Sequence, residues 1–99
     1  MARAVVWSEE AVDDVDAIAS YISMDSETYA SAVVRDILQK ARRLSDFPLM
    51  GRMVPEFNDA DIREVFSYSY RIVYRLGRES ITIAAVVHGS RLLDRGLDP

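Results

Sequence analysis

The residues best suited to chemistry lie in the second half of the chain. His88 is the only histidine, and histidine is the side chain that most readily exchanges a proton near neutral pH. Arg63, Arg71 and Arg75 could bind phosphates or carboxylates through paired hydrogen bonds. Together these side chains offer proton transfer beside an anion-binding patch. The ordinary alternative is a strand-end histidine bonded to backbone, next to a solvated sheet face.

The composition excludes several other kinds of site. The sequence has no cysteine, so it can form neither a disulfide nor a thiolate metal site. Its four glycines form no phosphate-binding loop, and no serine lies in a nucleophile motif. The acids near the start are interpreted as partners of a helix dipole rather than metal ligands; they are Glu9, Glu10, Asp13, Asp14 and Asp16. We expect no metal and no cofactor.

Charge is unevenly distributed along the 99 residues, whose net charge is −4. Residues 1–34 hold seven acids against Arg3 alone, whereas residues 35–99 hold eleven bases against nine acids. A general nucleic-acid-binding domain is clearly basic, because phosphate neutralisation supplies most of its affinity. We therefore expect no direct sequence-specific nucleic-acid binding. The longest apolar run has five residues, 83–87, far short of the ~20 needed to span a membrane. The expectation is one cytoplasmic domain, residues 1–99, without membrane contact.

Hydrophobic periodicity predicts the elements that position these side chains. Residues 2–7 are apolar and β-prone and predict a first strand. Ser8 is a candidate N-cap, and apolar residues at helical spacing predict a helix over 9–23. A second helix follows the cap candidates Asp25 and Ser26 and ends before Phe47-Pro48. Residues 45–61 predict a loop with a short edge strand near 53–54. Alternating residues then predict strands over 62–66, 70–76 and 81–88.

This order, β-α-α-β-β-β, predicts an α+β fold: an N-terminal strand, a helical hairpin and a three-stranded antiparallel meander, with the helices packed on one face of the sheet. A three-residue loop at 67–69 would pair Val65 with Arg71, and a four-residue loop at 77–80 would pair Leu76 with Ile81. The helix face then carries Ile62, Phe66, Tyr70, Ile72, Tyr74, Leu76, Ile81, Ile83, Ala85 and Val87. The opposite face carries Arg63, Val65, Arg71, Val73, Arg75, Thr82, Ala84, Val86 and His88. In this register Glu64 points toward the helices, where a carboxylate does not fit.

Five short segments follow one another in a set order. They are Phe47-Pro48-x-x-Gly51-Arg52, Val54-Pro55-Glu56, Ile62-Arg63-Glu64-Val65, Tyr70-Arg71-Ile72-Val73-Tyr74-Arg75 and Val87-His88-Gly89-x-Arg91. As a set they resemble the ParE/RelE superfamily of bacterial type II toxins, over nearly the whole chain. The resemblance implies a compact α+β toxin of a plasmid-stabilisation type, encoded with an unstable antitoxin that binds it and blocks its action.

The two branches of that superfamily imply different activities. RelE-like members are ribosome-dependent mRNA endonucleases that use basic residues and a C-terminal tyrosine, whereas ParE-like members inhibit DNA gyrase. Arg71 and Arg91 match arginines of the nuclease branch, and with His88 they form the candidate catalytic set of that alternative. However, Ile62 and Glu64 stand where the nuclease branch carries lysines, and no tyrosine follows Arg91.

These departures favour the ParE-like interpretation: a gyrase inhibitor that acts by binding and is neutralised by a ParD-like antitoxin. The expected contacts to target or antitoxin are Arg63, Val65, Arg71, Val73, Arg75, Val86 and Arg91, together with the outer groove of the helical hairpin. The antitoxin's tail is expected to be acidic and amphipathic. Two alternatives stay open, a RelE-like endoribonuclease and a non-toxic binding or co-repressor module in the antitoxin complex.

Overall fold

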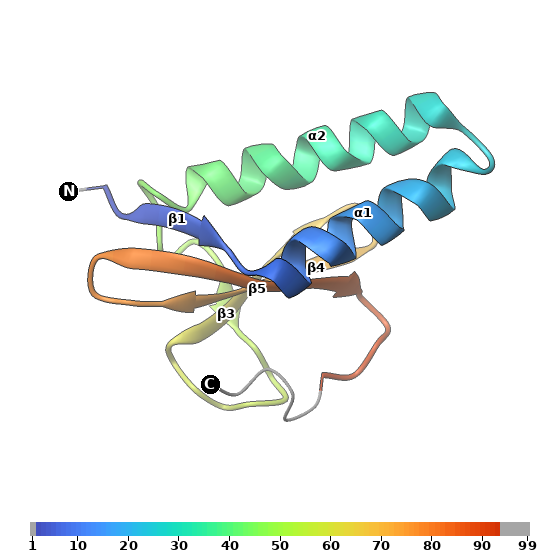
Figure 1. Cartoon of the computed structure of the whole chain (residues 1–99). Helices are drawn as coiled ribbons and strands as arrows, with labels where there is room; N and C mark the ends of the chain where they lie inside the picture. Colours follow the sequence, from blue (N-terminus) through green and yellow to red (C-terminus); the bar gives the residue numbers. More distant parts are fainter. Residues whose placement is uncertain (1, 94–99) are drawn as a thin grey trace.

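The computed structural model describes residues 2–93, which form two helices and a five-stranded sheet (Figure 1). In chain order the elements are β1 Ala4–Trp7, α1 Glu9–Ser23, α2 Glu27–Arg43, β2 Arg52–Met53, β3 Ile62–Ser67, β4 Tyr70–Leu76 and β5 Ser80–His88. The predicted α+β class, with a leading strand, a helical hairpin and a meander, is confirmed. The predicted first helix has the bounds of α1, and β2 is the short edge strand expected in the loop.

Local signals explain both helices. The Ser8 hydroxyl oxygen accepts the backbone N–H of Ala11 at 3.1 Å, and the Ser26 hydroxyl oxygen accepts that of Tyr29 at 3.0 Å. These caps satisfy amide groups that have no partner within the helix. Basic residues occupy the last turn of α2, where the helix dipole favours positive charge. The apolar stripe of α2 then faces the sheet and is buried; it contains Ala30, Val33, Ile37 and Ala41.

The strand order in the sheet is β1-β5-β4-β3-β2, with β1 parallel to β5 and all other pairs antiparallel. The first strand therefore lies beside the last, a long-range pairing that the sequence does not indicate. Both helices cover one face of the sheet (Figure 1). A main core lies between the helices and this face, and a second cluster lies on the opposite face. The second cluster contains Val54, Ile62, Val73, Ala85 and Val87, with Phe57 and Leu93 packed against it.

The predicted register between β3 and β4 is wrong by one residue. Phe66 pairs with Arg71 and Val65 with Ile72, because the turn has two residues and Ser67 still belongs to β3. Tyr68 makes this turn with a positive φ of 53°, a conformation that its residue type does not predict. A shift of one residue moves every side chain of β3 to the other face of the sheet. Val65 consequently faces the helices, and Glu64 faces away from them.

The predicted pairing of Leu76 with Ile81 is confirmed, but a bulge interrupts the ladder further along β5. Tyr74 pairs with Ile83 and Val73 with Ala85, so that Ala84 is skipped. Side chains near the start of α1 satisfy the backbone groups of the bulge. The Ser8 hydroxyl donates to the carbonyl of Ala84 at 3.2 Å, and the N–H of Val86 donates to Asp14 at 2.9 Å.

The bulge exchanges the faces that follow it. Val86 packs in the main core with the helices, whereas Ala85 and Val87 belong to the second cluster. The His88 ring lies against that of Tyr70, with centroids 5.8 Å apart. The register shift and the bulge together move four residues from the predicted helix face to the other side of the sheet: Ile62, Phe66, Ala85 and Val87. Four others move in the opposite direction: Arg63, Val65, Val86 and His88.

Candidate functional site

The predicted arginine-bearing face is not one surface. Val65 and Val86 pack against the main core, and Val73 is buried in the second cluster. Arg63 serves the neighbouring loops, since it donates to the carbonyls of Gly51 at 3.0 Å and Ala60 at 2.9 Å. Arg75 is half-buried. All the predicted contact residues lie within residues 2–93, which the structure describes. Among them only Arg91 has an exposed side chain.

Arg71 lies at the centre of a buried ion-pair cluster on the face opposite the helices. Its side chain bonds Glu64 through Nε at 2.6 Å and Glu56 through both terminal nitrogens at 2.8 Å. The residue is 4% exposed, and Glu64 is 1% exposed. Arg52 completes the cluster from the rim, with Nε 2.6 Å from Glu64 and its guanidinium 5.3 Å from the Phe66 ring centroid. Two carboxylates thus neutralise the arginine that would bind a phosphate in a nuclease.

The same cluster holds the segment that follows β5. Arg71 donates to the carbonyl of Arg91 at 3.0 Å, and the N–H of Leu93 donates to Glu56 at 3.1 Å. Leu93 itself packs against the second apolar cluster. The hydrogen bonds from Arg71, reinforced by that of Leu93, lower the pKa of Glu56 to about 2. In turn, the hydrogen bonds to Glu56 and Glu64 raise the pKa of Arg71. Glu56 and Arg71 are therefore both charged at neutral pH, and neither has a proton to exchange near that pH.

The low pKa of Glu56 predicts an acid-sensitive fold. The usual pKa of this carboxyl is 4.5 and its folded value is about 2. Its stabilising effect is therefore complete above pH 4.5 and is lost as the pH falls toward 2. We expect roughly 2–3 kcal/mol of unfolding free energy to disappear across this interval. Urea unfolding at a series of pH values measures the loss. In Glu56→Gln this part of the dependence should be missing; equal slopes in both proteins would contradict the assignment.

His88 does not join Arg71 in a catalytic arrangement. Its side chain is exposed, and Nδ1 lies 2.8 Å from the Ser90 hydroxyl and 3.2 Å from the Ser90 amide nitrogen. The ring contacts Tyr70, which points toward the helices, whereas Arg71 points to the opposite face. The two side chains therefore do not meet on one face of the sheet. His88 matches the ordinary interpretation of a strand-end residue bonded to its neighbours.

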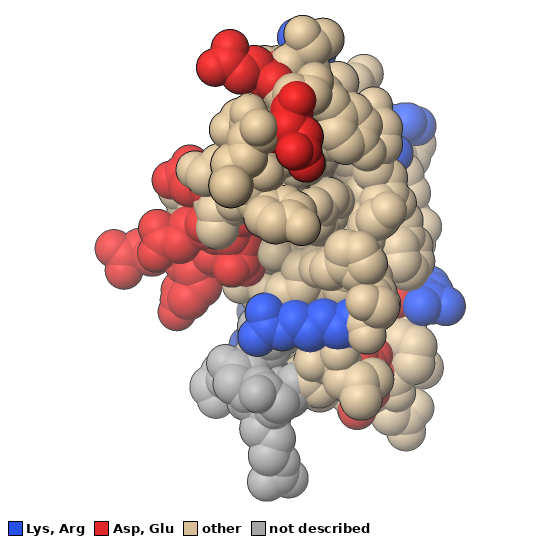
Figure 2. All heavy atoms as spheres, turned by 90° about the vertical axis from the view of Figure 1, so that its right-hand side faces the viewer, with Lys and Arg blue, Asp and Glu red and all other residues tan. Residues whose placement is uncertain are grey.

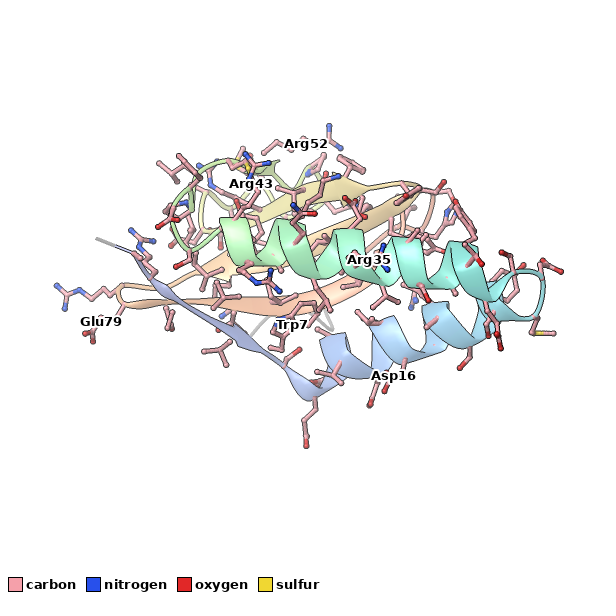
Figure 3. All side chains as sticks on the ribbon, turned by 90° about the horizontal axis from the view of Figure 1, so that it is seen from above. Trp7, Asp16, Arg35, Arg43, Arg52 and Glu79 are labelled. Carbon is pink, nitrogen blue, oxygen red and sulfur yellow. The ribbon has the colours of Figure 1, made fainter. Side chains whose placement is uncertain are left out.

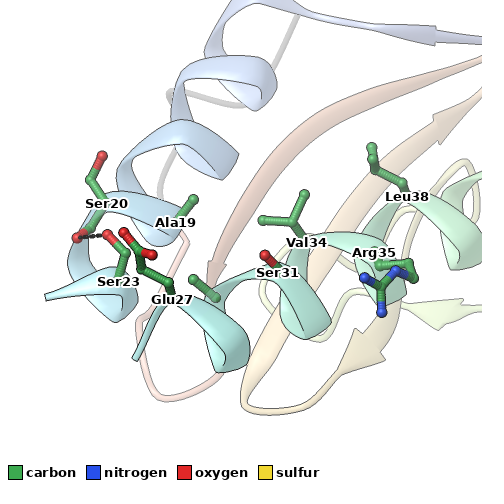
Figure 4. Close-up of a pocket in the computed structure, with 9 residues that line it drawn as sticks. Ala19, Ser20, Ser23, Glu27, Ser31, Val34, Arg35 and Leu38 are labelled. Carbon is green, nitrogen blue, oxygen red and sulfur yellow. Dashed lines mark hydrogen bonds between the residues drawn. The ribbon is translucent and has the colours of Figure 1, made fainter. Parts of the chain in front are cut away.

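The predicted groove on the outer side of the helical hairpin is present. It has a volume of about 680 Å³ and is lined by Ala19, Ser20, Ser23, Glu27, Ala30, Ser31, Val34, Arg35 and Leu38. Figure 4 shows Ala19 of α1 and Val34 of α2 at the groove, with Glu27 and Arg35 projecting from α2. Small side chains and hydroxyls leave room for a helix or an extended chain to approach. Chemically the groove offers an apolar floor with opposite charges near its ends.

Charge divides the two helices that border this groove. Seen from above, Asp16 points outward from α1 on the side away from α2, whereas Arg35 and Arg43 lie along α2 (Figure 3).

Within residues 2–93, no group of three or more His, Cys, Asp or Glu side chains could hold a metal ion. In the same part of the chain, neither helix is long and apolar enough to cross a membrane.

Comparison with known proteins agrees with this description. A family model for the ParE toxin of the type II toxin–antitoxin system parDE matches residues 5–93. A solved structure described as a chromosomal ParDE toxin–antitoxin system from P. aeruginosa has a similar fold. Its TM-score is 0.72 at 20% sequence identity, over 87% of this chain and 95% of that one. No curated protein matches the sequence. Because the family match spans nearly the whole chain, this protein belongs to the ParE toxin family of type II toxin–antitoxin systems.

Proposed function

We propose that this toxin arrests bacterial growth by inhibiting DNA gyrase, and that a ParD-like antitoxin neutralises it in the cytoplasm. The observation that carries the proposal is that neither of the two positions where the nuclease branch has a lysine carries a free cation in this protein. Ile62, where that branch carries a lysine, is buried in the second apolar cluster. Glu64, at the other lysine position, is bound to Arg52 and Arg71. Without those cations, a phosphate transition state lacks its stabilising donors.

Arg71 supports the same conclusion, because its guanidinium is engaged by Glu56 and Glu64. A substrate phosphate would have to displace two carboxylates from a buried position, which costs the pairing of those carboxylates with Arg71 and the desolvation of the phosphate itself. Action by binding requires no such displacement. Loss of an unstable antitoxin would then release the toxin in cells that lose the genes, which is the logic of plasmid stabilisation.

The hairpin groove is the proposed site for the antitoxin. An acidic amphipathic tail could place its apolar side chains over Val34 and Leu38 and its carboxylates near Arg35, which lines the groove. Such complementarity of charge increases the rate of association and selects the partner. The arginines expected to meet this tail, Arg63, Arg71 and Arg75, are buried or half-buried. In the proposal, the exposed basic residues of α2 contact the acidic side chains of the tail instead.

The proposed target is tested with two purified assays run side by side. Added to gyrase and relaxed plasmid, the toxin is expected to abolish supercoiling, because it occupies a surface that the enzyme needs. Added to ribosomes programmed with mRNA, it is expected to leave the message intact. Induced cells should show a DNA-damage response before protein synthesis falls. Cleavage of mRNA at codon positions, with gyrase unaffected, would overturn the proposal in favour of the nuclease.

Two variants separate binding from catalysis in the same assays. In His88→Gln a general base is lost, which would cost a nuclease roughly 10²–10⁴ in rate; an inhibitor that acts by binding should stay toxic. Arg91→Ala removes an exposed side chain but keeps the carbonyl that Arg71 binds. We expect it to be folded and less toxic through weaker target contact. A folded His88→Gln protein without toxicity would restore the catalytic interpretation.

A further inference from the structure

We propose that a cluster of exposed aromatic side chains at one end of the molecule is a second docking surface, which takes a lysine- or arginine-bearing segment of a partner protein. This aromatic end consists of Tyr21, Tyr29, Tyr68, Tyr70 and His88. It contains four of the five tyrosines of the sequence. None of its five members lines the hairpin groove, which the aromatic end adjoins at Glu27.

The fold brings these rings together from separate elements. Tyr29, at the start of α2, meets Tyr68 of the β3–β4 turn edge to face, with centroids 5.6 Å apart. Tyr70 of β4 meets His88 of β5 in the same way, at 5.8 Å. Tyr21 belongs to the last turn of α1, next to the hairpin tip that leads to Tyr29 at the start of α2. Edge-to-face contacts fix ring orientation, so the surface is ordered before any partner arrives.

Three of the four tyrosines are exposed, whereas Tyr70 is partly buried and packs against the main core. Tyr21 is 72% exposed and Tyr68 is 53% exposed. Tyrosine is enriched among residues that dominate binding energy at interfaces, because it provides a large contact area with few rotatable bonds. A contiguous exposed aromatic surface of this kind indicates an interaction site.

Tyr68 carries an additional sign of function. Its φ of 53° is in the left-handed region, which glycine and asparagine adopt more readily than an aromatic residue. A turn optimised for stability alone would place one of those residues here. The ring is instead retained at a strained position, where it extends outward against Tyr29. Strain of this kind concentrates at functional surfaces.

The surrounding charge indicates the chemistry of the partner. Figure 2 shows this end of the molecule: uncharged side chains fill its middle, acidic side chains gather above and along one margin, and basic side chains lie on the other margin and below. Asp25 and Glu27 lie between Tyr21 and Tyr29 in the sequence, at the tip of the hairpin. Aromatic faces bind cationic groups, and nearby carboxylates strengthen that preference. A single-stranded nucleic acid would also stack on tyrosines, but it needs a cationic channel, whereas the hairpin tip between Tyr21 and Tyr29 carries Asp25 and Glu27.

The test uses the full-length protein and two labelled peptides of equal length, one alternating leucine with lysine and one alternating leucine with glutamate. Fluorescence anisotropy at physiological salt should show binding of the lysine peptide and none of the glutamate peptide. Tyr68→Asn removes the ring but suits the positive φ, so the turn is kept; it should weaken binding about tenfold. Tyr68→Phe keeps the ring and should bind within about twofold of the natural protein.

Phe47→Ala is the matched control, because Phe47 is an aromatic residue 58% exposed on the loop after α2. It should bind the lysine peptide as the natural protein does. Unchanged affinity in Tyr68→Asn would overturn the proposal, since binding would then follow from net charge alone. Direct binding of a labelled single-stranded oligonucleotide to the protein, weakened in Tyr68→Asn, would also overturn it, in favour of a nucleic-acid surface.

Discussion

Replacing Arg71 by alanine is expected to lower the free energy of unfolding by about 3–5 kcal/mol, the cost of removing one partner from a buried ion pair. Glu64 would remain 1% exposed with Arg52 as its remaining ion-pair partner. Glu56 would lose both hydrogen bonds from the guanidinium, and the carbonyl of Arg91 would lose its donor. Urea unfolding followed by circular dichroism measures the change. For a domain of this size the melting temperature should fall by more than 10 °C, at roughly 4–8 °C per kcal/mol.

Arg52→Ala is the matched control, because Arg52 binds the same carboxylate from the surface. Its side chain is 60% exposed, and an exposed ion pair contributes about 1 kcal/mol or less. Equal losses in the two variants would contradict the view that burial makes the Arg71 pairs important. Because a substitution at Arg71 would act on folding, the antitoxin contact is better tested by charge reversal at Arg35, which lines the groove.

The sequence predicts well those features that local signals decide. Ser8 and Ser26, as N-cap residues, indicate where α1 and α2 begin. The spacing of the apolar residues that follow determines which face of each helix is buried. The period of two in the apolar residues likewise predicts the strands of the meander. Pairing of β1 with β5 was not predicted, because no local pattern identifies the partner of a strand about 75 residues away.

The candidate site was harder to predict because it depends on register. Two departures from regular structure moved side chains between faces: the turn at Tyr68 and the bulge opposite Val73 and Tyr74. Asparagine or glycine at 68 would have signalled a two-residue turn, and tyrosine does not. The bulge depends on Asp14, 72 residues before Val86 in the chain. Glu64, which did not fit the predicted face, was the available sign that the register was shifted.

The segments that resemble the ParE/RelE superfamily meet in space as parts of the framework. Glu56, Glu64 and Arg71 come from three of them and form the buried ion-pair cluster. Pro48, Gly51 and Tyr74 come from the first and the fourth: the Tyr74 hydroxyl donates to the Pro48 carbonyl at 2.8 Å and accepts the Gly51 N–H at 3.0 Å. An ordered set of motifs can therefore identify a fold without marking a catalytic site.

Gly51→Ala is expected to show how tightly this framework is built. An added Cβ would lie 2.5 Å from the Glu64 carbonyl oxygen and 2.7 Å from the Tyr74 hydroxyl. Neither neighbour can move freely, because Glu64 pairs with Arg52 and Val73 in the sheet and Tyr74 is fully buried. Relief would require breaking the Tyr74 hydrogen bonds that hold the loop from Pro48 to Gly51. We expect a loss of about 3 kcal/mol, at the upper end of the usual cost of overpacking.

Gly89→Ala supplies the comparison, since its Cβ would meet the Ser69 carbonyl oxygen at 3.2 Å, a contact that a shift of a few tenths of an ångström relieves. Its expected cost is no more than about 1 kcal/mol. Both φ angles are negative, so the difference between the variants reports steric contact rather than backbone freedom. Urea unfolding of the two proteins measures it. An equal loss of stability in the two variants would contradict the prediction that close packing against β3 and Tyr74 requires glycine at position 51.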